Sequence, residues 1–225
     1  MTDVLPGTVQ VWSDIACPWA TLFVERLWQT RARLGLELDI RIDHRVFSLE
    51  RANDQPFGRG LLDNEAQDIL GLEPTLGWQP WHGPADAWPM SSLVAMHAVQ
   101  AAKHEAVGGL AASERLDLLL RRALFNESRS IDDAAEVIAV ARSVDGLDQD
   151  AFAAAMDDGL GEAALERDTA LVGELGIEAS PQVLLADGTS VVNPGIEFPE
   201  SPDAPPRQDI DMIDDLLRRA ISPQG

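Results

Sequence analysis

The residue with the clearest chemical potential in this sequence is its single cysteine, Cys17. It follows residues 9–12, an apolar-polar alternation typical of a strand, and precedes Pro18, a residue favoured in the first turn of a helix. Backbone N–H groups without partners and the helix dipole both stabilise a thiolate at such a position. We therefore predict a Cys17 pKa below the ~8.5 of a free cysteine, and a nucleophile for disulfides or electrophiles. The alternative is a buried, inert cysteine.

The elements around Cys17 predict a crossover unit. Apolar residues recur at helical spacing after Pro18 until Gly35, which we expect to end the helix. Residues 36–43 then alternate between apolar and charged side chains, which predicts a second strand with one buried face. Residues 51–90 predict irregular structure, with Trp78, Trp81 and Trp88 either lining a groove above Cys17 or, as we favour, packing that segment onto the core.

The rest of the chain predicts a helical middle followed by a second set of strands. Helices are expected over residues 91–104, from 113, from 130 with a capping box at its start, from 148, and over 161–175. A hairpin with its turn at Asp187-Gly188 and a final amphipathic helix follow. We interpret this order as an α/β fold in which one sheet is assembled from both ends of the chain, with β-α-β and β-β-α halves and a helical insertion between them.

Composition excludes several classes of function. The net charge of −21 argues against a nucleic acid or an anionic membrane as a partner, and no segment is apolar and long enough to predict a membrane span. The four histidines show no metal-ligand spacing, so no metal site is expected. A lone cysteine rules out an internal disulfide, and with no secretory leader evident at the N-terminus it favours a reducing, cytoplasmic location.

Residues 12–19, Trp-Ser-Asp-Ile-Ala-Cys-Pro-Trp, resemble the active-site segment of the DsbA-like thioredoxin-fold oxidoreductases, in particular the FrnE-type branch. Residues 176–183 resemble the loop of that family whose proline is cis, and residues 124–131 resemble part of its helical insertion. The resemblance implies a thioredoxin-fold domain made of residues 1–58 and 176–225, and an insertion domain of residues 59–175. It departs at Ala20, where the family has its second cysteine, so that the motif reads CPWA instead of CPWC.

The resemblance also assigns roles to the residues near the thiol. It implies that Cys17 is the catalytic residue and that a thiol or disulfide substrate, peptide or small molecule, contacts a small set of neighbours: Pro18, Trp19, Ala20, Ser180 and Pro181. Ser180 could lower the thiol pKa, although we favour a hydrogen bond to its own loop. Asp14 is a candidate proton acceptor, although satisfying backbone N–H groups is the favoured role. His44 is expected at the end of a strand, where it could pair with a carboxylate or with the thiolate.

Three functions remain open at this point. A one-cysteine (monothiol) catalyst would form a mixed disulfide through Cys17, which an external thiol must then release because Ala20 cannot resolve it. A thiol-binding enzyme related to 2-hydroxychromene-2-carboxylate isomerases and glutathione transferases would use the same fold to bind glutathione and would not exchange disulfides. A non-catalytic member of the family would bind a partner through the groove that forms the active site in catalytic members. No tightly bound cofactor is expected; a low-molecular-weight thiol such as glutathione or an analogue is the candidate co-reactant.

Overall fold

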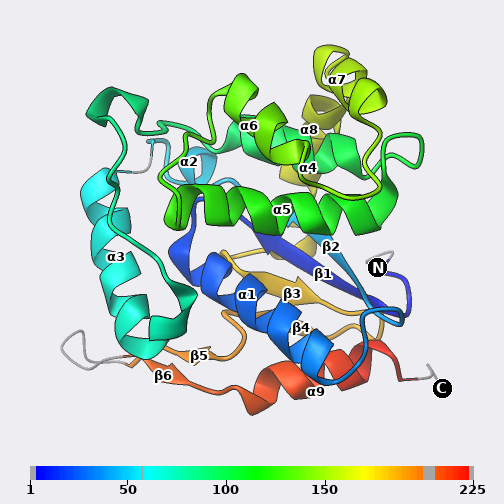
Figure 1. Ribbon diagram of the computed structural model, residues 1–225. Helices are drawn as coiled ribbons and strands as arrows, with labels where there is room; N and C mark the ends of the chain where they lie inside the picture. Colours follow the sequence, from blue (N-terminus) through cyan, green and yellow to red (C-terminus); the bar gives the residue numbers. More distant parts are fainter. Residues whose placement is uncertain (1–3, 57, 200–205, 223–225) are drawn as a thin grey trace.

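A four-stranded mixed sheet forms the centre of the molecule (Figure 1). The computed structural model describes residues 4–56, 58–199 and 206–222. The strand order is β2-β1-β3-β4, with β1 parallel to β2 and antiparallel to β3, which in turn is antiparallel to β4. The strands of this sheet are β1 (Thr8–Ser13), β2 (Arg41–Val46), β3 (Gln182–Leu184) and β4 (Ser190–Val192). A separate pair is formed by β5 (Ile196–Glu197) and β6 (Arg207–Gln208).

Helix α1 (Pro18–Arg33) links β1 to β2, and α9 (Asp211–Ala220) follows the last strand. Every element between β2 and β3 in the described chain is helical. In order these are α2 (Leu49–Ala52), α3 (Arg59–Leu72), the short 3-10 helices η1 (Pro74–Leu76) and η2 (Ala85–Ala87), α4 (Leu93–Ala102), α5 (Gly109–Phe125), α6 (Ala134–Ala141), α7 (Gln149–Asp157) and α8 (Leu160–Leu175). The predicted α/β architecture, two halves around one sheet with a helical block between them, is confirmed. The domain boundaries at residues 58 and 175 stay a prediction.

The alternation of β1 explains why both faces of the sheet are covered. Val9 and Val11 point to one face, where they pack with residues of α1, α5 and α9 such as Phe23 and Leu217. Trp12 points to the other face and packs among residues of α8. Because successive side chains of a strand point in opposite directions, one strand can anchor both layers.

The outer edge of β2 is covered by side chains instead of another strand. The Ile42 N–H donates to Glu114 Oε2 at 2.7 Å, and the Val46 N–H donates to Asp168 Oδ2 at 3.0 Å. Between them, the His44 carbonyl accepts from Gln100 Nε2 at 2.9 Å. These partners come from α4, α5 and α8, so the helical block supplies the hydrogen bonds that a neighbouring strand would otherwise make.

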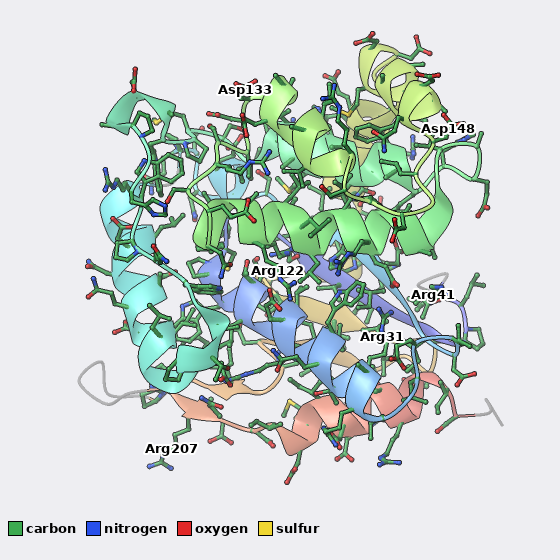
Figure 2. The ribbon with its side chains drawn as sticks, in the orientation of Figure 1. Arg31, Arg41, Arg122, Asp133, Asp148 and Arg207 are labelled. Carbon is green, nitrogen blue, oxygen red and sulfur yellow. The ribbon has the colours of Figure 1, made fainter. Side chains whose placement is uncertain are left out.

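Ion pairs hold α5 on α1. Arg122 binds the Glu25 carboxylate through two nitrogens at 2.6 and 2.7 Å, and Figure 2 shows Arg122 between the two helices. Arg31 makes the second link, donating to both oxygens of the buried Glu114 carboxylate at 3.1 and 2.9 Å. The two-nitrogen contact of Arg122 fixes orientation as well as distance, whereas Arg31 reaches both Glu114 oxygens through Nη1 alone; together the two pairs hold α5 over α1.

Three sequence predictions are wrong in position. The segment expected to be irregular contains α3, whose buried Leu62, Ala66 and Ile69 recur at helical spacing. The second strand begins at Arg41, because residues 36–39 form a turn that leaves the Leu38 side chain 90% exposed. Helix α6 is capped by Asp133, whose Oδ1 accepts from the Ala135 N–H, and not by the capping box beginning at residue 130 (Figure 2).

The close approach of α8 to α4 at Gly161 predicts that alanine substitution at the two glycines of α8, Gly161 and Gly173, has different effects on stability. A Cβ on Gly161 would lie 2.0 Å from the His97 backbone oxygen, whereas a Cβ on Gly173 would have no heavy atom within 4 Å. We expect Gly161→Ala to lower the free energy of unfolding by about 2 kcal/mol or more, because the clash is with backbone. Gly173→Ala should be neutral or stabilising by about 0.5–1 kcal/mol. Urea unfolding of both variants checks this, and equal midpoints would refute the packing argument.

Candidate functional site

The turn between β1 and α1 fixes the position of Cys17. The Asp14 carbonyl accepts from the Cys17 N–H at 3.2 Å, and Cys17 is the N-cap residue of α1, with Pro18 in the first helical position. Pro18 lacks an N–H, so it leaves no donor unsatisfied there. The predicted placement of the cysteine at a helix N-terminus directly after a strand is thus confirmed.

The thiol itself is buried, with the Cys17 residue 5% exposed. Its S–H donates to the Ser180 carbonyl at 3.1 Å, because the loop carrying the cis Ser180–Pro181 bond lies against the start of α1. This hydrogen bond satisfies the protonated sulfur, whereas a thiolate at the same place would face a carbonyl oxygen.

The prediction of a lowered thiol pKa is wrong for this structure. Burial raises the pKa of Cys17 to about 11, and the carboxylates of Asp14 and Glu65 raise it further. Hydrogen bonds from Ser180 and from the Ala20 N–H lower this pKa; their effect is smaller than that of burial but larger than that of the two carboxylates. The helix N-terminus is present as expected, but desolvation of the charged sulfur outweighs it.

Asp14 is fully buried, and each of its carboxylate oxygens accepts a backbone N–H. Its Oδ1 accepts from the Ala16 N–H and its Oδ2 from the Leu49 N–H, both at 2.8 Å. Burial raises the pKa of Asp14, while hydrogen bonds from Ser92, Leu49 and Ala16 lower it. The side chain therefore joins the β1–α1 turn to the start of α2, which is the structural role that the sequence favoured.

Ser180 makes a second link between the two halves of the fold. Its Oγ accepts from the Asp14 backbone N–H at 2.9 Å, while its carbonyl accepts from the thiol. The hydroxyl thus bonds across to the turn before α1, and not within its own loop as the sequence suggested.

A cleft of about 280 Å³ opens beside the thiol. One wall comes from the cysteine turn and the facing loop, and the other from α2, the segment after it and α3. The lining residues are Ala16, Cys17, Pro18, Trp19 and Ser180 on the first side, and Leu49, Glu50, Asn53, Gln55, Pro56, Gly58, Leu61, Leu62 and Glu65 on the second. Mainly apolar walls with a few polar groups are typical of sites for small molecules or short peptide segments.

The residues predicted to contact substrate do not all reach this cleft. Pro18, Trp19 and Ser180 line it, and the half-buried Trp19 ring lies edge-on to Phe198 at 4.9 Å between centroids. Ala20 and Pro181 are buried and are not among the lining residues.

The tryptophan-rich segment packs into the core, as we favoured from the sequence. Trp78 stacks on Phe125 with centroids 4.7 Å apart, and Trp81 lies edge-on to Trp88 at 5.2 Å. Trp78 and Trp81 are buried, and none of the three tryptophans lines the cleft beside Cys17.

A buried polar network that the sequence did not reveal lies beneath the cysteine turn. The Arg121 guanidinium donates to the Asp14 carbonyl at 3.0 Å, to Ser13 Oγ at 2.8 Å and to Thr21 Oγ1 at 3.2 Å. It also binds the carboxylate of Asp117, one turn earlier on α5, at 2.6 Å. Both residues lie on the helix predicted from residue 113, and no sequence signal there indicates that a charged pair is buried.

His44 lies within β2, not at its end, and faces this network. Its Nδ1 is 3.3 Å from Asp117 Oδ1, so the carboxylate is its neighbour and the thiol is not. Burial lowers the pKa of His44 to about 4, with Arg121 and Lys103 lowering it too, while Asp117 and Asp43 raise it. The imidazole is therefore neutral at physiological pH.

The described residues hold no cluster of three or more His, Cys, Asp or Glu side chains arranged to hold a metal ion. Within the same part of the chain, no helix is both long and apolar enough to cross a membrane.

A family model for the DSBA-like thioredoxin domain matches residues 8–217. The chain belongs to this family. The resemblance drawn from residues 12–19 and 176–183 is confirmed at this level, and the fold of the DSBA-like domain is the thioredoxin fold with its helical insertion. No curated protein matches the chain.

Solved structures with this fold include oxidoreductases and an isomerase. A probable DsbA oxidoreductase from Streptomyces coelicolor has a TM-score of 0.67 at 20% identity, covering 97% of this chain and 92% of its own. The cytosolic disulfide reductase DsbM from Pseudomonas aeruginosa has a TM-score of 0.62 at 18% identity, covering 82% and 87%. A 2-hydroxychromene-2-carboxylate isomerase has a TM-score of 0.60 at 15% identity, with the same coverage. At these identities the likeness establishes the shared fold of the DSBA-like domain.

The contribution of Glu65 to the thiol pKa gives a direct test. We expect the alkylation rate of Cys17 to rise with pH towards a midpoint near a pKa of about 11. Glu65→Gln should move the midpoint down and speed alkylation at pH 8 by about two- to fivefold, because a negative charge near the thiolate is removed. Asp157→Asn, at the end of α7 away from the cleft, is the matched control and should change nothing. An unchanged midpoint in Glu65→Gln would contradict the assignment.

The buried neutral His44 predicts a pH dependence of stability. Its pKa of about 4 in the folded state lies below the ~6.5 of an unfolded chain, so the unfolded state binds the proton more readily between these values. The contribution of the neutral His44 to the free energy of unfolding is fully present above pH 6.5. It is lost as the pH falls towards 4, for a total of about 3 kcal/mol. Denaturant unfolding from pH 7 to 4 should show a steeper loss for the wild type than for His44→Gln. Parallel curves would show that His44 does not titrate in this way.

Proposed function

We propose that this chain is a one-cysteine catalyst of thiol–disulfide exchange, acting through Cys17. The observation that carries the proposal is the position of the only sulfhydryl: it borders the cleft, at a helix N-terminus, against the carbonyl that precedes Pro181. Solved structures with the same fold include proteins described as a disulfide reductase and a probable oxidoreductase, which supports the general reaction class. Residues 12–19 support placing the chain in the FrnE-type branch.

Each step of the proposed reaction breaks one disulfide bond and forms another, so the numbers of thiols and disulfides stay the same. Cys17 loses its proton to solvent or a nearby base, and the thiolate attacks one sulfur of a bound disulfide. The new bond joins Cys17 to that half of the substrate, while the other half leaves as a thiolate and takes up a proton. An external low-molecular-weight thiolate then attacks the substrate sulfur of the mixed disulfide, which regenerates Cys17. Ala20 offers no thiol, so the second step depends on the concentration of the external thiol.

The raised pKa makes the resting thiol a slow nucleophile. With a pKa of about 11, roughly one molecule in a thousand carries the thiolate at pH 8. A high pKa also makes each thiolate more nucleophilic, which recovers part of this loss. In our proposal, a substrate N–H that bonds to the Ser180 carbonyl removes the acceptor of the thiol proton and favours ionisation in the occupied cleft.

A second function is favoured by the protonated sulfur. A thiol that stays neutral can donate a hydrogen bond to the sulfur of a bound thiol cofactor, as a serine hydroxyl would at this position. Structures with the same fold support this candidate, since DsbM has been solved with GSH and a 2-hydroxychromene-2-carboxylate isomerase shares the fold. Here the chain would bind a thiol and catalyse isomerisation or transfer without a mixed disulfide.

We also propose a cytoplasmic location and a thiol or disulfide reactant as the partner. A single cysteine suits a reducing compartment, where external thiols are abundant enough to release the mixed disulfide. DsbM, with a similar fold, is described as cytosolic.

Two substitutions separate these functions. We expect Cys17→Ser to abolish mixed-disulfide formation and turnover if exchange is the reaction, whereas cofactor binding would survive it. For the wild type, the rate of product release from the mixed disulfide should be proportional to the external thiol concentration. Ala20→Cys places a resolving thiol on the first turn of α1, so its release rate should become independent of external thiol.

Stopped-flow release assays with mass spectrometry of the intermediates measure both effects. Wild-type release that does not depend on the external thiol would exclude the one-cysteine mechanism. A chain that neither forms a mixed disulfide nor turns over a disulfide would exclude exchange and leave the thiol-binding enzyme and the binding-protein hypotheses.

A further inference from the structure

The charges on the cleft walls are all of one sign. Among the described residues that line the cleft beside Cys17, the only charged side chains are Glu50 and Glu65. Lysine, arginine and histidine are absent from that lining, although the chain carries 17 lysines and arginines elsewhere. A reactant that enters the cleft therefore meets two carboxylates and no cation.

No cationic side chain among the described residues balances the charge of these two carboxylates. Glu50 Oε1 accepts from Ser91 Oγ at 2.9 Å, and its Oε2 is buried without a hydrogen-bond partner among the described residues. Neither Glu50 nor Glu65 forms an ion pair with a described residue. Burial raises the pKa of Glu65, and so does the neighbouring Asp68, which is the response expected of a carboxylate without a cation beside it.

The nearest basic residues in the sequence are engaged elsewhere. Arg51, next to Glu50, binds Glu166 on α8 at 2.8 Å. Arg59, at the start of α3, binds Asp63 at 3.3 Å and the Trp81 carbonyl at 2.8 Å. Neither guanidinium lines the cleft, so among the described lining residues no cationic side chain balances the carboxylates of Glu50 and Glu65.

We infer that the cleft selects thiol and disulfide reactants that are neutral or cationic near the sulfur and disfavours those with carboxylates there. The inference rests on the proposed exchange reaction at Cys17 and names the class of its substrate and of its releasing thiol. A glutathione-type reactant with carboxylates at both ends is then the disfavoured kind, and an amine-bearing or uncharged thiol the favoured kind.

Charge close to the sulfur should change the rate measurably. In a partly hydrated cleft, two carboxylates within several ångströms of a reactant charge change its local concentration by about tenfold or more at low salt. The effect should shrink as salt is added, because the Debye length falls from about 30 Å at 0.01 M to about 3 Å at 1 M.

Three small disulfides of similar size test the inference on the full chain at pH 8. They are cystamine, a dication; bis(2-hydroxyethyl) disulfide, which is neutral; and dithiodiglycolate, a dianion. The measured quantity is the rate of mixed-disulfide formation at Cys17 by mass spectrometry, divided by the rate for the urea-unfolded chain with the same probe. We expect this ratio to decrease in the order cystamine, neutral disulfide, dianion, by about tenfold or more overall in 10 mM salt.

The Glu50→Gln, Glu65→Gln double variant should bring the three ratios to within about twofold of one another, even though its thiol pKa also changes, because that change acts on all three probes alike. Each single variant should give an intermediate spread, which keeps the test available should the double variant fold poorly. Asp157→Asn removes a negative charge from α7 and should keep the full spread.

The outcomes separate the two proposals. Equal ratios for cystamine and dithiodiglycolate in the wild type, with all three probes reacting, would overturn the charge selectivity and leave exchange at Cys17 standing. A spread that persists in the double variant would overturn it as well, because the net charge of the chain would then be the cause. No reaction with any probe, the neutral one included, would overturn both the exchange reaction and the selectivity built on it.

Discussion

The buried guanidinium of Arg121 sets the geometry on which the site depends. It reaches from α5 to the end of β1 and the first turn of α1, where it binds the Asp14 carbonyl, Ser13 and Thr21. Asp117 balances its charge at 2.6 Å. Leaving a buried cation without partners costs folding free energy. The position of Arg121 on α5 therefore fixes the position of the turn that carries Cys17. The helical block is therefore a positioning element of the site, even though the thiol belongs to the other part of the fold.

Burial of the cysteine turn also explains why the thiol is held in its protonated form. A helix N-terminus offers N–H groups and partial positive charge, which by themselves favour a thiolate. Around Cys17, however, the sulfur is removed from water, a carbonyl accepts its proton, and the nearest charged groups are carboxylates. Desolvation is the largest of these influences, and it raises the pKa to about 11. Chemistry at this sulfur is thus controlled by what enters the cleft as much as by the resting protein.

The sequence predicted the parts of this structure that depend on local signals. Pro18 after Cys17 and Gly35 marked the ends of α1, and Asp187-Gly188 marked the hairpin, because each acts within a few residues. The segments flanking Cys17 and Pro181 identified the family. Glu65 escaped notice because α3 was interpreted as irregular, although Leu62, Ala66 and Ile69 already had helical spacing. The position of Arg121 and the burial of the thiol depend on contacts between residues more than a hundred positions apart in the chain, and no local sequence pattern indicates such contacts.

The outer edge of β2 has a consequence for what the helical block can be. Its N–H and carbonyl groups at Ile42, His44 and Val46 are bound by Glu114, Gln100 and Asp168, all from residues 93–175. An uncovered strand edge of this kind is a template on which a strand of another molecule can add. A shortened chain without these helices would present that template to its own copies, and association into β-aggregates would compete with folding. The block therefore also prevents strand addition at the β2 edge of the central sheet.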